Sequence, residues 1–294
     1  MSTKPESYYV PAQSYWPIVG SVALFLMAFG GASLIHESTS LYQAETNMGF
    51  LFYIGLFILL FMFWGWWRDV INESMQNLYS DQMDRSFRQG MIWFITSEIM
   101  FFAAFFGALF YVRNLVIPWL GGEGSGLMTH NILWPEFIAQ WPLLLTPEGE
   151  TTQAMKPTGL PLYNTIILLT SSITLTIAHH ALKENNRKKL IGFTGLTVLL
   201  GLIFLTLQVE EYIHAYEDLG LTMGSGIYGS TFFLLTGFHG AHVTIGTIML
   251  IVMTCRCAVG HFTWQNQFAY EATAWYWHFV DVVWVFLFIF VYWL

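Results

Sequence analysis

The chain has 294 residues, of which 55% are hydrophobic, 18% aromatic and only 10% charged, and its mean hydropathy is +0.52. A soluble domain carries about a quarter charged residues, so this composition excludes an ordinary soluble protein and indicates an integral membrane protein. The formal net charge is −8 and the few basic residues are scattered, which argues against a nucleic-acid partner.

Seven apolar stretches are long enough to cross the roughly 30 Å hydrocarbon core of a bilayer as helices. In chain order they cover residues 16–34, 48–67, 90–112, 162–182, 190–208, 228–255 and 272–294. We therefore predict an all-α membrane protein with seven transmembrane helices, in which residues 1–294 form a single membrane domain.

The distribution of basic residues predicts how the chain is oriented. All Lys and Arg residues except Arg113 and Lys156 fall in the N-terminal tail or in loops on the same side of the membrane, and Lys4 is among them. Because cytoplasmic loops are enriched in Lys and Arg, we expect the N-terminus inside and the C-terminus outside. The long loop over residues 113–161, rich in Gly, Pro and carboxylates such as Glu148, is then an irregular acidic cap on the outer face.

One carboxylate, Glu98, lies in the middle of the third predicted span. An ionisable group inside a bilayer is costly, so it usually faces protein or water and is a functional hypothesis by default. The residues three and four positions away on a helix are apolar: Phe94, Ile95, Phe101 and Phe102. Such surroundings favour the uncharged carboxyl, which suits a proton carrier and equally a neutral hydrogen-bond donor.

Two pairs of polar residues lie in the last two predicted spans. His239 and His242 are three residues apart, so their rings lie on one face of a helix and could ligate a metal or haem. His278 and Asp281 have the same spacing and could pair with one another. Buried His and Asp residues more often make hydrogen bonds between helices than bind metal, so a structural role is favoured for all four.

Small residues in the sixth predicted span explain that region without a cofactor, because they let helix backbones approach closely. These residues are Gly237, Gly240, Ala241 and Gly246.

Arginines and tryptophans gather at the predicted inner interface. Arg68 follows Trp66 and Trp67, and Arg256 ends the sixth span at the same level. A guanidinium group beside flat indoles is suited to hold lipid phosphate, because Arg offers forked donors at headgroup depth. Ordinary interfacial anchoring is the alternative interpretation.

Five blocks of sequence, in order along the seven spans, resemble subunit III of the haem–copper cytochrome c oxidases. They are WWRDVINES at 66–74, GMIWFITSEIMFF at 90–102, AHHAL at 178–182, YGSTFFLLTGFHGAHVTIG at 228–246 and EATAWYWHFVDVVW at 271–284. Five blocks at matching places are far more specific than a single short motif.

The resemblance implies a layout and a set of residue roles. A V-shaped, lipid-filled cleft would separate the first two helices, 16–67, from a five-helix bundle, 90–294, and the chain would pack against the catalytic subunit I. Glu98 matches the intramembrane carboxylate of the family. Arg68 and Arg256 match arginines that contact cleft phospholipids, and Glu73 looks like another group lining the cleft.

The resemblance also implies that this chain has no catalytic residue, metal or cofactor of its own. Haem and copper would belong to subunits I and II, and cytochrome c would react with the whole complex. The expected function is that of a non-catalytic core subunit of a proton-pumping cytochrome c oxidase, which supports proton uptake and the stability of subunit I. The long outer loop resembles bacterial members, which favours a bacterial inner membrane over a mitochondrial one.

Two alternatives to this function are considered. Subunit III of a quinol oxidase would have the same partner chemistry, but such members typically lack the first two spans. A stand-alone haem or metal membrane enzyme would need a ligand set from His239, His242 and His278.

Overall fold

The computed structural model describes residues 9–39, 48–76, 78–145, 149–263 and 266–294, so Lys4 and Glu148 lie outside the described residues. Within these ranges, seven helices are long and apolar enough to cross a membrane. The described residues form no β-strand beyond one isolated bridge between Leu145 and Thr151. The prediction of an all-α protein with seven spans is therefore confirmed.

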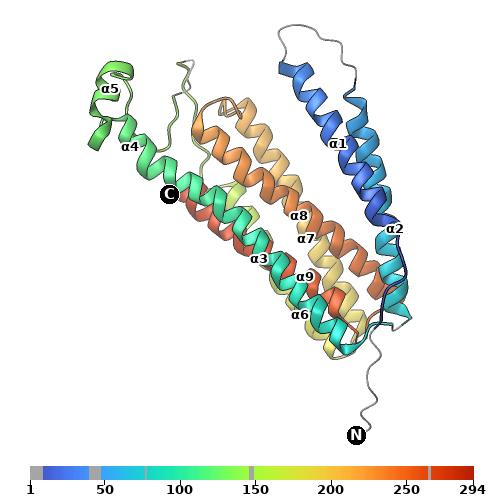
Figure 1. Cartoon of the computed structure of the whole chain (residues 1–294). Coiled ribbons are helices and arrows are strands. Elements are labelled where there is room, and N and C mark those ends of the chain that lie inside the picture. The colour runs from blue at the N-terminus through green and yellow to red at the C-terminus, as the bar shows by residue number, and fades with distance from the viewer. Residues whose placement is uncertain (1–8, 40–47, 77, 146–148, 264–265) are drawn as a thin grey trace. The chain divides into compact units, whose positions relative to one another are not determined.

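The long helices follow one another along the chain as Figure 1 shows. They are α1 (Trp16–Thr39), α2 (Phe50–Met75), α3 (Asp81–Tyr111), α6 (Leu160–Lys183), α7 (Arg187–Glu217), α8 (Ile227–Val259) and α9 (Phe268–Leu287). A π-helical turn, Val112–Val116, joins α3 to the short α4 (Ile117–Leu120), and α9 continues into a second π-helical turn, Phe288–Trp293. The short α5 (Leu127–Leu133) lies beyond α4.

The predicted bounds of the third span, 90–112, are too short at both ends. The helix begins at Asp81, where Asp81 and Asp84 complement the positive end of the helix dipole. Beyond Tyr111 the backbone stays helical through the π-helical turn Val112–Val116 and α4, although Pro118 has no N–H to donate. The first part of the expected outer loop is therefore helix. Hydropathy detects only the segment inside the hydrocarbon, whereas the backbone continues beyond it.

The chain divides into two compact units, residues 1–87 and residues 88–294. In the first unit, α1 and α2 pack along one another as a hairpin. A Cβ atom added at Gly55 would lie 2.7 Å from the carbonyl oxygen of Ala23, and one at Gly30 would lie 2.2 Å from the backbone nitrogen of Phe52. The two backbones come this close only because both positions lack a side chain.

In the second unit, α6, α7, α8 and α9 pack in a closed ring, each against two neighbours. The core of this ring lies on α9, whose Trp277 and Trp284 are both 0% exposed. The indole of Trp277 packs against two glycines, because a Cβ atom would lie 2.8 Å from it at Gly201 and 2.9 Å at Gly246. Its Nε1 donates a hydrogen bond to Ser171 Oγ at 2.9 Å, so the buried ring keeps no unpaired donor.

The predicted set of small packing residues on α8 is only partly right. Gly246 lies against Trp277, but a Cβ atom at Gly240 would meet nothing within 4 Å and one at Gly237 would make an ordinary contact. Ala241 is exposed. The sequence does not show which face of α8 meets α9, and only Gly246 lies on that face.

Helix α3 joins this ring through side chains rather than by close backbone approach. Phe94 stacks on Tyr276 of α9 with ring centroids 6.2 Å apart, and Phe102 meets Phe279 at 6.1 Å. Bulky aromatic rings fill the space between the backbones. The position of α3 therefore depends on a small number of side-chain contacts.

Candidate functional site

Glu98 of α3 makes a direct polar contact with His242 of α8. The distance from Glu98 Oε2 to His242 Nε2 is 2.8 Å, and the two side chains are 21% and 13% exposed. The two residues lie near the middles of their helices, 144 positions apart in sequence. The intramembrane carboxyl thus has a partner that local sequence around it does not reveal.

A second contact of the same ring fixes the number of protons in this pair. His242 Nδ1 lies 2.6 Å from the backbone carbonyl oxygen of Phe238. A carbonyl oxygen can only accept, so Nδ1 carries a proton. The contact between Nε2 and Glu98 then holds one proton, either on the carboxyl beside a neutral ring or on an imidazolium beside a carboxylate.

Both of these proton arrangements leave the Glu98–His242 pair without net charge. A neutral pair avoids most of the cost of placing a lone charge in hydrocarbon. The expectation of an uncharged carboxyl at Glu98 is therefore sharpened to that of an uncharged pair. The shared proton has two positions, one on Glu98 Oε2 and one on His242 Nε2, and these positions are less than one hydrogen-bond length apart.

Aromatic rings enclose the imidazole of His242. Phe102 meets it edge to face with centroids 5.0 Å apart, Tyr276 stacks at 6.4 Å and Phe279 lies at 6.3 Å. Phe101 lies at 6.0 Å on the α3 side. These rings come from both α3 and α9. The Glu98–His242 contact is therefore a polar contact surrounded by aromatic side chains, where α3 packs against α8 and α9.

An ion pair gives α3 a second polar contact, this one with α9. Arg88 Nη1 lies 2.6 Å from Glu271 Oε2, and the two side chains are 31% and 19% exposed. Two polar contacts, this one and the Glu98–His242 pair, therefore set the register of α3 along the ring of helices.

His239 takes no part in the Glu98 contact, although it shares a helix face with His242. It is 0% exposed, and its Nε2 donates to the carbonyl oxygen of Val280 at 3.2 Å. Its ring packs against Phe204 and Trp284 in the centre of the ring of helices. His239 thus points to the core and His242 to α3, so the two rings do not converge on one ligand.

His278 and Asp281 of α9 lie near one another, with 3.6 Å between His278 Nδ1 and Asp281 Oδ2. That distance is too long for a hydrogen bond, and His278 Nδ1 instead lies 2.7 Å from Ser172 Oγ of α6. In the described part of the chain, no group of three or more His, Cys, Asp or Glu side chains is placed to hold a metal ion.

The expected lipid-binding residues of the first unit lie on α2. Trp66 and Trp67 are exposed and stacked, with centroids 6.1 Å apart, and the Arg68 guanidinium lies 5.8 Å from the ring centroid of Trp64. Glu73 does not lie beside Arg68 in an ion pair.

Glu73 instead accepts hydrogen bonds from two phenols, Tyr79 at 2.8 Å and Tyr9 at 3.3 Å. Burial, followed by the hydrogen bond to Glu73, raises the pKa of Tyr79 above its ordinary value. Its phenol therefore stays protonated through the neutral range and continues to donate.

Arg256, near the end of α8 in the second unit, is less accessible than expected. Only 7% of it is exposed, and its guanidinium lies 4.4 Å from the ring centroid of Phe262. An arginine held on an aromatic face can still present the outer edge of its guanidinium to a phosphate. The lipid contact of Arg256 stays a prediction.

Sequence reasoning found Glu98 but missed its partner. The spacing of His239 and His242 directed attention to a shared site on α8, whereas the contact is made across to α3. The sequence does show that Glu98 and His242 both lie near the middle of a predicted span, and therefore at a similar depth in the membrane. Because α3 and α8 are antiparallel neighbours in the structure, two residues at that depth can meet.

Comparison with known proteins gives a consistent result over the whole chain. The family model described as cytochrome c oxidase subunit III matches residues 6–294. A protein named cytochrome c oxidase subunit 3 from Latimeria chalumnae is 42% identical over 294 residues, covering 100% of this chain and 99% of the relative. Proteins of the same name from Cyprinus carpio and Homo sapiens are each 40% identical with the same coverage.

Proposed function

Because this chain belongs to the cytochrome c oxidase subunit III family and is thus part of that oxidase complex, we propose that it supports proton uptake by subunit I and binds structural phospholipid. In this proposal haem and copper belong to subunits I and II, as the resemblance to the family implies. Subunit I is its direct partner, and cytochrome c meets it only through the complex.

The observation that carries the proton part of the proposal is the Glu98–His242 contact. Two titratable groups share one proton at the middle of the membrane, and both stay partly exposed at 21% and 13%. A proton can therefore move between the two groups without a lone charge being left in hydrocarbon. Such a pair is suited to keep a nearby proton path supplied during turnover.

The test is the lifetime of the complex during turnover. Replacing Glu98 with Gln keeps the shape and a hydrogen bond but removes the exchangeable proton. We expect Glu98→Gln to leave the initial rate of oxygen reduction near that of the unaltered oxidase. The lifetime of the oxidase during turnover should shorten about two- to ten-fold, which is the size of effect that coupling between distant groups typically has. Unchanged durability together with unchanged proton uptake would count against a role for this carboxyl.

A matched control separates this effect from a general change in α3. Thr96 lies on the same helix, is exposed, and bonds only to the carbonyl oxygen of Ile92 in its own helix at 2.8 Å. Thr96→Val removes one polar group from the same stretch of membrane without touching the pair, and the lifetime of this variant should match that of the unaltered oxidase.

Arg68 supports the lipid part of the proposal best. It is exposed beside the stacked Trp66 and Trp67, and no ion pair joins it to another described residue. A guanidinium in this setting is free to bind a lipid phosphate at headgroup depth. Arg256 belongs to the same proposal, although its 7% exposure leaves only the edge of the group accessible.

The lipid proposal is tested by counting phospholipids retained by the purified complex. We expect Arg68→Gln and Arg256→Ala each to lower the count, whereas Arg85→Gln, an equal change of charge at another exposed arginine, should not. An unaltered lipid count by mass spectrometry in both variants would refute the proposal.

The cellular location is part of the same proposal. The chain is a multi-pass membrane protein with seven helices able to span a bilayer. We place it in the inner membrane of a bacterium, with the N-terminus inside and the C-terminus outside. Support comes from the long acidic loop after α3 and from the one-sided distribution of Lys and Arg.

A further inference from the structure

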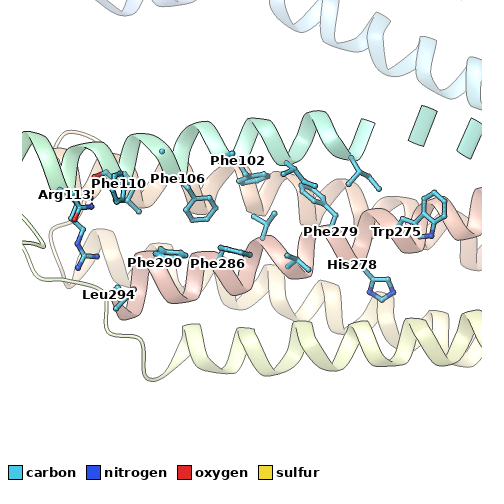
Figure 2. Close-up of a pocket in the computed structure, with 18 residues that line it drawn as sticks. Phe102, Phe106, Phe110, Arg113, Trp275, His278, Phe279, Phe286, Phe290 and Leu294 are labelled. Atoms are coloured by element: carbon cyan, nitrogen blue, oxygen red, sulfur yellow. Dashed lines mark hydrogen bonds between the residues drawn. The ribbon is translucent and has the colours of Figure 1, made fainter. Parts of the chain in front are cut away.

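An apolar groove of about 1000 Å³ runs between α3 and α9 on the surface of the second unit. Figure 2 shows Phe102, Phe106 and Phe110 on the α3 side and Phe286 and Phe290 on the α9 side. This volume is at the upper end of the range of about 300–1000 Å³ that is usual for ligand sites.

The two ends of the groove differ in charge. Arg113 and Asn114 lie at one end, and Figure 2 shows Leu294 close to Arg113 there. The other end holds Trp275 and His278, and the ring of His278 already bonds to Ser172. Among the residues that the structure describes, no Asp or Glu side chain lines the groove. Arg113 is the one Lys or Arg among the residues that line the groove, and it stands at one end of an apolar trough.

The charge of Arg113 has no carboxylate partner among the described residues, and its guanidinium lies over the ring of Trp141 with 5.9 Å to the centroid. Trp141 is itself fixed by an edge-to-face contact with Tyr228 at 5.7 Å. The guanidinium is therefore held in place by a ring and keeps its hydrogen-bond donors for another group.

Both walls of the groove change helical form at this end. Arg113 and Asn114 lie in the π-helical turn Val112–Val116, and Phe290 lies in the π-helical turn Phe288–Trp293. Single π-helical turns inside α-helices redirect side chains and are frequent at functional sites. Here one π-helical turn joins α3 to α4 and another follows the end of α9, and both lie at the same end of one groove.

We propose that this groove binds a phosphate-bearing anionic membrane lipid, with an acyl chain along the phenylalanines and the phosphate on Arg113. A guanidinium is suited to phosphate because its forked N–H donors match two of the oxygens. An amphiphile with one anionic head and an apolar tail matches a trough that is apolar along its length and cationic at one end. A partner helix would have no use for the unpaired Arg113 unless it carried a carboxylate at that depth.

This lipid site is separate from the lipid contact proposed for Arg256. Arg113 lies beyond the C-terminal end of α3, whereas Arg256 lies near the start of α9, at the end of the unit where Arg88 pairs with Glu271. Binding at Arg113 does not depend on the lipid contacts proposed under the function, and it is tested by different substitutions.

The test uses the whole oxidase, stripped of loosely bound lipid and titrated with dioleoyl phosphatidylglycerol or with dioleoyl phosphatidylcholine, with bound lipids counted by native mass spectrometry. One arginine near a membrane surface contributes about a five-fold preference for an anionic lipid. We expect Arg113→Gln to weaken phosphatidylglycerol binding about five-fold and to change phosphatidylcholine binding little.

A second pair of variants tests the groove itself. Gly107 lines it, and a Cβ atom there would meet nothing within 4 Å, so Gly107→Phe places a ring in the space proposed for the acyl chain. Gly192, on α7, is exposed and equally open but lies outside the groove, which makes Gly192→Phe the control. Gly107→Phe should lower binding of both lipids and Gly192→Phe of neither.

Two results would overturn the proposal. One is unchanged phosphatidylglycerol binding in Arg113→Gln. The other is a loss of a partner subunit from the Gly107→Phe complex with no change in lipid count, because a protein segment would then be the occupant of the groove. The Arg113→Gln arm stays decisive even if the larger substitution impairs assembly.

Discussion

A carboxyl in the middle of a membrane span is unusual at the residue scale, and the structure gives Glu98 a specific partner. His242 lies 2.8 Å away, and its second nitrogen is already bonded to Phe238. The position of Glu98 inside a span could be predicted from sequence because charge stands out in an apolar run. The partner could not, because the contact depends on how α3 packs against α8.

Removing the imidazole should cost more stability than removing the carboxyl proton. His242→Phe leaves Glu98 without its partner inside the membrane, and we expect this variant to lose about 1–2 kcal/mol. Glu98→Gln keeps a hydrogen bond to the ring and should lose less. The measurement is thermal unfolding of this subunit within the purified complex, and equal losses in the two variants would contradict the pairing.

A second residue-scale prediction concerns Tyr79, which lies outside the spans. A pKa raised in the folded chain means that the folded state holds the phenol proton more tightly than the unfolded state, so the added stability is present below about pH 10. It is lost as pH rises further. Unfolding temperatures between pH 8 and 11 should fall more steeply for the unaltered protein than for Tyr79→Phe, and parallel curves would contradict this.

At the scale of elements, the second unit is a ring of four helices with α3 resting on it through side chains. The number of spans was predictable because seven apolar runs of spanning length are separated by polar segments. The ends of the helices were not, because residues such as Asp81 and Pro118 favour or tolerate helix outside the hydrocarbon. Which helices of the second unit pack against one another was equally hidden, because the apolar surface of a membrane helix does not mark which face meets protein.

Two glycines of α8 make a matched test of ring packing. A methyl group at Gly246 would lie 2.9 Å from the fully buried Trp277, so Gly246→Ala should destabilise the unit by about 1–3 kcal/mol through overpacking. Gly240 has open space at the same atom, so Gly240→Ala should be neutral or slightly stabilising. Denaturation in detergent, followed by near-ultraviolet circular dichroism, measures both, and similar losses in the two variants would refute this packing.

At the scale of the whole molecule, the chain is a membrane subunit of a respiratory oxidase that contributes neither a strand nor a metal cluster within its described residues. Its family was predictable because five different blocks of sequence resemble those of the family and follow one another in the same order. The family match over residues 6–294 confirms this prediction. The role of individual side chains within the complex depends on partner subunits, which no single sequence contains.

Removal of this subunit should leave the redox centres intact. We expect the haem and copper content per complex to stay unchanged after selective dissociation of this chain with detergent, because the proposed function assigns haem and copper to subunits I and II. Absorption spectra and metal analysis before and after dissociation measure this. A loss of haem in proportion to the loss of the subunit would contradict it.

The most direct test of the central claim is whether Glu98 and His242 act as one unit during turnover. The measurement is the number of turnovers before inactivation for Glu98→Gln, His242→Gln and the double variant, all in the intact oxidase. Residues that act together lose their joint effect once either is changed, so the double variant should survive about as long as the weaker single variant. Independent, additive losses in the double variant would contradict a shared proton between the two side chains.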